Sequence, residues 1–175
     1  FRESNIANVE GIERIRERFE AHNLYVTGVG LGGRALKNQL LGLPERDRDI
    51  DAICETVRRI GQVYADKTPA ESPVIIMDQR ITYWASEGWK GSTHIPGRGG
   101  VMLYDFHASR DADQADAPAG QVPLEETWAR IDYLYDRLVP VAEEAGIRLA
   151  THPDDPPMHV YRGAPQEPNS FSGFK

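Results

Sequence analysis

The chain has 175 residues, with 20 Lys and Arg against 27 Asp and Glu, so its formal net charge is −7 and its pI about 5.2. Apolar residues make up 40% of the chain, too many for a wholly disordered protein, and the acidic balance argues against a nucleic-acid-binding domain, which usually carries a basic face. No apolar run approaches the roughly 20 residues that a bilayer span needs, so we expect no membrane insertion.

The first predicted element is an amphipathic helix over about residues 8–21. Apolar side chains recur at every third or fourth position from Val9 to Phe19, and charged residues fill most of the remaining positions. Asn8 is a suitable N-cap for this helix. Residues 24–30 form a short run of apolar, β-branched and aromatic residues that ends in glycines. This pattern predicts a buried strand.

A second amphipathic helix is predicted over about residues 45–62, and Cys54 lies within its apolar stripe. A thiol in that position is usually structural, so we do not expect Cys54 to bind a metal. Since Cys54 is the single cysteine of the chain, an internal disulfide framework is excluded, and a reducing cytoplasm is the expected compartment.

The middle of the chain alternates between one clear strand and segments without periodicity. Residues 74–77 form an apolar run bounded by proline and aspartate, which predicts a fully buried strand. Residues 79–100 are rich in Gly, Trp and Ser and predict a long functional loop, because aromatic residues are scarce in disordered tracts. Residues 101–106 are consistent with a strand or an extended arm, and residues 111–120 with a solvated surface loop.

A long helix is predicted from about Pro123, with Gly146 as the residue that ends it. Pro140 should kink this helix or split it in two. Residues 147–152 then predict another strand. Strands that alternate with helices indicate an α/β protein with parallel strands and helical crossovers. In such folds the chemistry gathers at the carboxyl ends of the strands.

The glycine cluster over residues 28–33 formally matches the GxGxxG pattern of dinucleotide-binding proteins. That turn must open directly into a long helix whose N-terminus faces the pyrophosphate. Here residues 34–41 allow only about two helical turns before Gly42 and Pro44 interrupt them. The pattern therefore favours a flexible loop at a strand end over a cofactor turn.

The densest chemical signal is the run that begins with His152 and includes Asp154 and Asp155 between prolines. A single histidine is more often structural than a ligand, but the rigid acidic tail favours a site. Imidazole with carboxylate suits Mn, Fe, Ni or Zn. Metal sites usually have three or four protein ligands, and His107 and His159 are further candidates.

Arg98 lies within a second glycine cluster, over residues 97–100. Flanking glycines let a backbone approach a ligand closely, and a guanidinium binds a carboxylate with two hydrogen bonds. The cluster is therefore either a binding loop for a carboxylate or an ordinary surface loop tip.

Residues 146–157 strongly resemble the HPDDPP segment of mannonate dehydratases, members of the xylose-isomerase-like TIM-barrel superfamily. Three further stretches, residues 40–47, 96–100 and 139–146, are similar to the same family in the same order. The resemblance implies an α/β fold of the (β/α)8 TIM-barrel type. Since such a barrel needs about 250 residues, we expect the chain to form a single domain over residues 1–175 that covers only a central part of the barrel.

The resemblance also implies an activity: dehydration of a sugar acid, such as D-mannonate to 2-keto-3-deoxy-D-gluconate. It implies a divalent metal, Mn²⁺ first and Fe²⁺ as the alternative, with His152 as a ligand. The family's other ligands, a Cys, a second His and an Asp, are expected from later strands outside this chain. The expected partner is a small sugar acid, with no nucleic acid and no membrane, in a homo-oligomer.

We hypothesise that Asp154 or Asp155 orients the ligands or moves a proton, and that Arg98 pairs with the substrate carboxylate. Loss of water from a 2,3-dihydroxy acid requires removal of the C2 proton beside a carboxylate, and a metal can stabilise the resulting enolate-like charge. Two alternatives stay open: a sugar isomerase or epimerase of the same superfamily, and a non-catalytic homologue that binds sugar acids.

Overall fold

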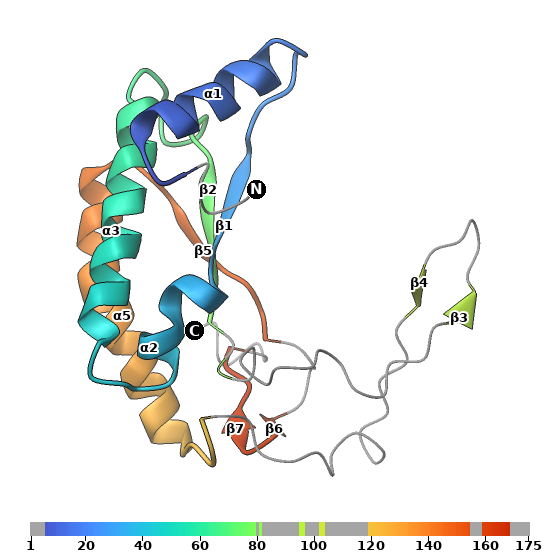
Figure 1. Ribbon diagram of the computed structural model, residues 1–175, viewed down its shortest axis with the longest axis vertical. Helices are drawn as coiled ribbons and strands as arrows, with labels where there is room; N and C mark the ends of the chain where they lie inside the picture. The colour runs from blue at the N-terminus through green and yellow to red at the C-terminus, as the bar shows by residue number, and fades with distance from the viewer. Residues whose placement is uncertain are drawn as a thin grey trace. The chain divides into compact units, whose positions relative to one another are not determined.

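The computed structural model describes residues 6–79, 81, 119–154 and 159–168, together with the strand backbones at 95–96 and 102–103 (Figure 1). The helices are α1 (Val9–Glu20), α2 (Lys37–Leu40), α3 (Arg46–Val63) and α5 (Leu124–Glu144), with a 3₁₀ helix over Gly33–Leu36. The strands are β1 (Gly28–Gly32), β2 (Val74–Asp78), β3 (Ile95–Pro96), β4 (Met102–Leu103), β5 (Leu149–Thr151), β6 (Val160–Tyr161) and β7 (Ala164–Pro165). None of the described helices is both long and apolar enough to cross a bilayer.

The chain divides into two compact units. Unit 1 comprises Phe1–Gln79 and Arg130–His152, and it contains α1, α2, α3, most of α5 and the strands β1, β2 and β5. Unit 2 comprises Arg80–Ala129 and Pro153–Lys175, with the remaining strands. The prediction of one domain over residues 1–175 stays a prediction.

A three-stranded parallel sheet in the order β1-β2-β5 forms the centre of unit 1. Gly28 pairs with Val74 and Gly32 with Asp78, and Ile75 pairs with Leu149 on the other side of β2. The chain passes from β1 to β2 through α3 and from β2 to β5 through α5 (Figure 1). The predicted α/β class with helical crossovers is therefore confirmed.

The first two predicted amphipathic helices are present with nearly the predicted bounds. Asn8 caps α1 as predicted, because its side chain accepts a hydrogen bond of 2.8 Å from the backbone N–H of Gly11. The helix predicted over residues 45–62 is α3, Arg46–Val63. Its apolar stripe packs into the core, where Ile50 and Val57 are fully buried.

The third predicted helix, α5, is a single element over Leu124–Glu144 that contains Pro140, so it is not split there, and the alternative of a kink stays a prediction. Pro140 is exposed, whereas Leu138 and Ala142 on either side of it are buried, so packing of the apolar face outweighs the lost hydrogen bond. Gly146 ends the helix as predicted. It has φ +66°, it donates to the carbonyl of Glu143, and Ile147 donates to the carbonyl of Ala142 at 2.9 Å.

The first strand lies further along the chain than predicted. Residues 24–27 are outside the strand, and Leu24 and Tyr25 are 55% and 74% exposed, so the prediction of a buried strand there is wrong. Pairing with β2 instead selects Gly28–Gly32. The predicted flexible glycine loop is thus strand, followed by the 3₁₀ helix and the four residues of α2, which is as short as predicted.

Gly32 marks the carboxyl end of β1 and has no room for a side chain. Its φ is +123°, and a Cβ atom built on it would lie 2.1 Å from the backbone oxygen of Asp78. Only glycine adopts this backbone conformation at low cost. The close approach of β1 and β2 at this edge therefore depends on that residue.

The two faces of the sheet differ in burial. Helices α3 and α5 cover one face (Figure 1), and the side chains packed there are fully buried, among them Ile75, Met77, Leu134 and Leu138. On the other face Gly30, Ile76 and Ala150 form one row across the three strands and are all exposed. Ile76 retains 37% of its accessible surface, unusual for the centre of a sheet.

A polar seam joins α3 to α5 at their exposed edge. Arg137 donates to Asp47 at 2.8 Å and also pairs with Asp51. Tyr133 donates to Asp47 at 2.7 Å, and the guanidinium of Arg46 lies 3.8 Å from the centre of the Tyr133 ring. These contacts fix the two crossover helices side by side, with modest energies because the groups face water.

Unit 2 contains short antiparallel pairs. β6 and β7 form a hairpin whose turn residues, Arg162 and Gly163, both have positive φ. A small apolar cluster of Ile81, Val122 and Ala164 lies in the same unit. β3 pairs with β4, so the predicted strand over residues 101–106 is present at Met102–Leu103, whereas most of 79–100 and 104–118 lie outside the described residues.

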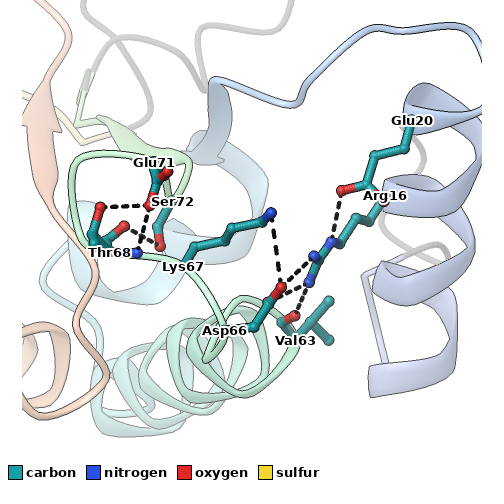
Figure 2. Close-up of polar contacts among 8 residues, drawn as sticks. All are labelled: Arg16, Glu20, Val63, Asp66, Lys67, Thr68, Glu71 and Ser72. Carbon is teal, nitrogen blue, oxygen red and sulfur yellow. Dashed lines mark hydrogen bonds and ion pairs between the residues drawn. The ribbon is translucent and has the colours of Figure 1, made fainter.

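Arg16 attaches α1 to the end of α3 (Figure 2). Its guanidinium donates to both carboxylate oxygens of Asp66, at 2.7 and 2.8 Å, to the carbonyl of Val63 at 2.6 Å and to Glu20 at 3.0 Å. It also lies over the Tyr64 ring, 5.1 Å from its centre. Through this paired hydrogen bond Arg16 lowers the pKa of Asp66 to about 2.

The loop between α3 and β2 is closed by its own side chains (Figure 2). The carboxylate of Glu71 accepts hydrogen bonds from the backbone N–H and the hydroxyl of Thr68, at 3.0 and 2.7 Å. The hydroxyl of Ser72 donates to the carbonyl of Thr68 at 3.0 Å. The same arrangement lowers the pKa of Glu71 and turns the chain back toward the sheet.

We expect Asp66→Asn to lower the melting temperature at neutral pH but not near pH 2. A carboxylate with a folded-state pKa of about 2 against an ordinary 3.8 stabilises the fold above its unfolded pKa and loses that effect as pH falls through 2. Thermal unfolding of both proteins from pH 7 to pH 2 measures this, with Asp132→Asn as an exposed control. A gap in melting temperature that stays constant down to pH 2 would contradict the assigned ion pair.

Candidate active site

The carboxyl edge of the sheet in unit 1 brings together the ends of three strands. Met77 pairs with Thr151, and the backbone N–H of His152 donates to the carbonyl of Met77 at 2.9 Å. The position beside His152 on the neighbouring strand is therefore Asp78, which pairs in turn with Gly32. The prediction that these strand ends meet at one edge is confirmed for the described residues.

Side chains alternate between the faces of a strand, so Asp78 and His152 lie on the same face of the sheet as Ile76 and Ala150. This is the face that the helices leave uncovered, and His152 is exposed on it. Asp78 is half-buried. Gly32, which pairs with Asp78 on its other side, adds no side chain. The edge therefore presents an imidazole and a carboxylate next to each other.

Asp78 is a candidate site residue that sequence reasoning did not select. It was placed at a strand end, but a single aspartate after an apolar run is a common strand terminator and carries no chemical signal of its own. Only the register, which sets it beside His152, gives it significance.

The other predicted site residues are distributed unevenly. Asp154 belongs to unit 2, is buried with 4% of its surface exposed, and donates its backbone N–H to the carbonyl of Pro168 at 3.1 Å. Asp155, Arg98 and His107 lie outside the described residues. His159 is exposed in unit 2.

A hydrogen-bonded chain of three side chains lies directly beneath the carboxyl edge, on the helix-covered face. The amide of Gln79 donates to the hydroxyl of Tyr135 at 2.9 Å, and that hydroxyl lies 2.9 Å from the hydroxyl oxygen of Thr151. Gln79 is 4% exposed. Burial raises the pKa of Tyr135 above its usual value, so the hydroxyl keeps its proton. No sequence motif predicted these hydrogen bonds.

The stretch over residues 40–47, which resembled the family, has a structural role in unit 1. Arg130 donates to the carbonyl of Leu40 at 2.9 Å and accepts a 2.6 Å hydrogen bond on its own carbonyl from Gln39. The guanidinium fills the space over Gly42, where a Cβ atom would lie 2.9 Å from it, at φ +67°. The positive φ of Gly42 therefore favours glycine in this turn, which α5 holds through Arg130.

Cys54 is a core residue, as predicted. Its thiol is buried, and its sulfur lies 3.9 Å from the carbonyl oxygen of Arg137 on the neighbouring helix. Burial raises the pKa of the thiol, which disfavours the thiolate that a metal would require.

The donors at the edge suit a divalent metal in type but do not complete a site. Imidazole nitrogen and carboxylate oxygen are ligands for Mn²⁺ and Fe²⁺. Among the residues that the structure describes, no three His, Cys, Asp or Glu side chains come together closely enough to hold a metal ion. His152 and Asp78 fit as part of a ligand set.

Taken together, unit 1 is an α/β structure with sequential parallel strands and an imidazole and carboxylate at their carboxyl ends, the arrangement typical of enzymes. Residues 114–170, which include the run that begins at His152, match the model of the family described as D-mannonate dehydratase (UxuA). Over this third of its length the chain is similar to the mannonate dehydratase family.

Curated relatives and a solved structure show the same similarity. Mannonate dehydratases of Streptococcus agalactiae serotype Ia and of Streptococcus uberis are each 27% identical over 166 residues, which is 87% of this chain and 47% of the relative. The crystal structure of mannonate dehydratase from Streptococcus suis serotype 2 superposes with a TM-score of 0.68 at 26% identity, over 90% of this chain and 43% of that one. The chain thus spans about half the length of these relatives.

Proposed function

We propose that the strands β1, β2 and β5 are consecutive units of a (β/α)8 barrel. In support, each strand lies next to its successor in the sequence, and each connection contains a helix. The exposed row of Gly30, Ile76 and Ala150 would face the barrel interior, which is filled by side chains from all eight strands. That arrangement accounts for a half-exposed isoleucine in a central strand.

We propose further that the protein containing this chain is a metal-dependent hydro-lyase that converts D-mannonate to 2-keto-3-deoxy-D-gluconate. The observation that carries this is the family match over residues 114–170, because it contains β5 and the His152 run at a carboxyl edge. The relatives of this chain are named mannonate dehydratases.

In this proposal the predicted site residues and Asp78 divide the work of removing water from a 2,3-dihydroxy acid. His152 binds the metal, with Asp78 beside it as a second ligand or as the acceptor of the imidazole N–H. Arg98 pairs with the substrate carboxylate through two hydrogen bonds. Asp154 or Asp155 takes the C2 proton or delivers one to the hydroxyl that leaves from C3.

A bound divalent cation, Mn²⁺ first and Fe²⁺ as the alternative, would supply Lewis-acid stabilisation of the enolate-like charge at the substrate carboxylate. The chain's own residues hold the proposed metal ligand His152 in place. The backbone of His152 is fixed at the end of β5 by its hydrogen bond to the carbonyl of Met77, and a positioned donor set costs little reorganisation during the reaction.

Incubation of the full-length protein with Mn²⁺ and a panel of aldonic acids and ketoses tests the function. Formation of a 2-keto-3-deoxy acid from D-mannonate is the expected result. An isomerised or epimerised sugar would instead assign the protein to another reaction of the same barrel superfamily, and binding without turnover would make it a sugar-acid-binding homologue. We expect the protein to be a cytoplasmic homo-oligomer, which light scattering and cell fractionation measure.

A further inference from the structure

The hydrogen-bonded side chains of Gln79, Tyr135 and Thr151 are unusual because they are polar and lie among apolar side chains between the sheet and α5. The neighbouring side chains Met77, Leu134 and Leu138 are fully buried and hydrophobic. A buried hydrogen bond contributes only about 1 kcal/mol net, and replacing both partners by apolar groups of the same shape is nearly neutral. Stability alone therefore does not account for these three side chains. Hydrogen bonds are directional, so they can instead set the orientation of the strand end to which they attach.

The position of the chain suggests what that role is. β5 has three residues, and just beyond it the backbone N–H of His152 donates to the carbonyl of Met77 on β2. The side chains of Thr151 and His152 point to opposite faces of the sheet, since neighbours alternate along a strand. A hydroxyl held on the helix face at Thr151 therefore holds the imidazole of His152 on the other face.

The consequences of losing this hold follow from the geometry of a strand. A slip of β5 by one residue would turn His152 toward the helices, because the side-chain period is two. The hydrogen bonds from Gln79 to Tyr135 and from Tyr135 to Thr151 can both form in one register only. They join the ends of β2 and β5 to α5 at the level of the candidate site.

Resting on the proposed function, we propose that Tyr135 is a positioning residue for the metal ligand His152. Its hydroxyl, held between Gln79 and Thr151, fixes the carboxyl end of β5 so that the imidazole is presented on the open face of the sheet. The residue touches neither substrate nor metal and acts through the backbone of residues 151 and 152.

The test uses the full-length protein with Mn²⁺ and compares Tyr135→Phe with Tyr133→Phe. Both variants remove one hydroxyl from the same helix, but Tyr133 bonds Asp47 on the exposed seam. We expect Tyr135→Phe to weaken Mn²⁺ binding roughly tenfold, the lower end of the range for changes around a metal ligand, and to broaden the electron paramagnetic resonance signal of the bound ion. Tyr133→Phe should leave both unchanged.

Substitutions at Thr151 separate positioning from simple stabilisation. Thr151→Val removes the hydroxyl at nearly constant shape and should weaken Mn²⁺ binding as Tyr135→Phe does, whereas Thr151→Ser should restore it. The double variant Tyr135→Phe/Thr151→Val should be no worse than either single variant, because both break one chain. A lower melting temperature with unchanged Mn²⁺ affinity in both single variants would overturn the proposal.

The outcome for His152→Ala distinguishes the two proposals. If this variant loses Mn²⁺ binding while Tyr135→Phe and Thr151→Val bind as the unaltered protein does, the positioning role fails and the proposed function stands. If His152→Ala retains full Mn²⁺ affinity, the metal-binding role of His152 fails, and with it the proposed function as stated.

Discussion

On the function proposed above, replacement of His152 by alanine should reduce kcat for dehydration of D-mannonate by roughly a thousandfold in the full-length protein. Lewis-acid stabilisation contributes several kcal/mol to such a transition state, and each 1.36 kcal/mol corresponds to about a factor of ten in rate. The expected loss is in kcat and in metal content together, measured by formation of the 2-keto-3-deoxy acid and by elemental analysis of the purified protein.

His22→Ala provides the control for this experiment. His22 is also exposed and belongs to unit 1, but it follows α1 and lies before the sheet begins, so it is not at the carboxyl edge. Its replacement should leave turnover and metal content unchanged. Full metal occupancy with unchanged turnover in His152→Ala would contradict the assignment of this histidine.

Gly32→Ala should produce the largest loss of stability of any single methyl addition in the sheet, about 3 kcal/mol or more. The residue has φ +123°, and its new Cβ atom would lie 2.1 Å from the backbone oxygen of Asp78 and 2.9 Å from the adjacent carbon. Strained backbone alone costs about 1–3 kcal/mol, and the overlap with main-chain atoms cannot be relieved by a side-chain rotation. Urea unfolding followed by circular dichroism measures the change.

Gly30→Ala is the matched control, two residues earlier in the same strand. Within the part of the chain that the structure describes, no atom lies within 4 Å of a Cβ atom built there. We expect a change within about 1 kcal/mol, since an alanine in a strand replaces the more flexible glycine without strain. Equal destabilisation by both substitutions would contradict the account of the β1 and β2 edge given above.

Local patterns in the sequence predicted the helices well because each helix carries its own signal. The 3.6-residue periodicity of α3, the cap at Asn8 and the ending at Gly146 all depend on residues close in sequence, and all three are confirmed. The run that begins at His152 was recognised in the same way, from a contiguous motif. Its placement at the end of β5 followed from the strand that precedes it.

Predictions that required long-range information were weaker. The bounds of β1 were wrong because Leu24 and Tyr25 have high strand propensity, whereas glycines 28–32 pair with β2. Of the two outcomes predicted at Pro140, a kink or a split, the split does not occur, because packing of α5 against the sheet outweighs a local preference. Asp155 and Arg98 remain predictions, since they lie outside the described residues.

The acidic composition and single cysteine of these 175 residues narrowed the class of protein, and the periodicity with the motif at His152 predicted the α/β class and the similarity to mannonate dehydratases. The tertiary structure alone decided which side chains meet: Asp78 beside His152, and Tyr135 between Gln79 and Thr151. The reason is physical. Asp78 and His152, 74 positions apart, become neighbours only through strand register, which depends on the pairing of whole strands and on a glycine small enough to let them approach.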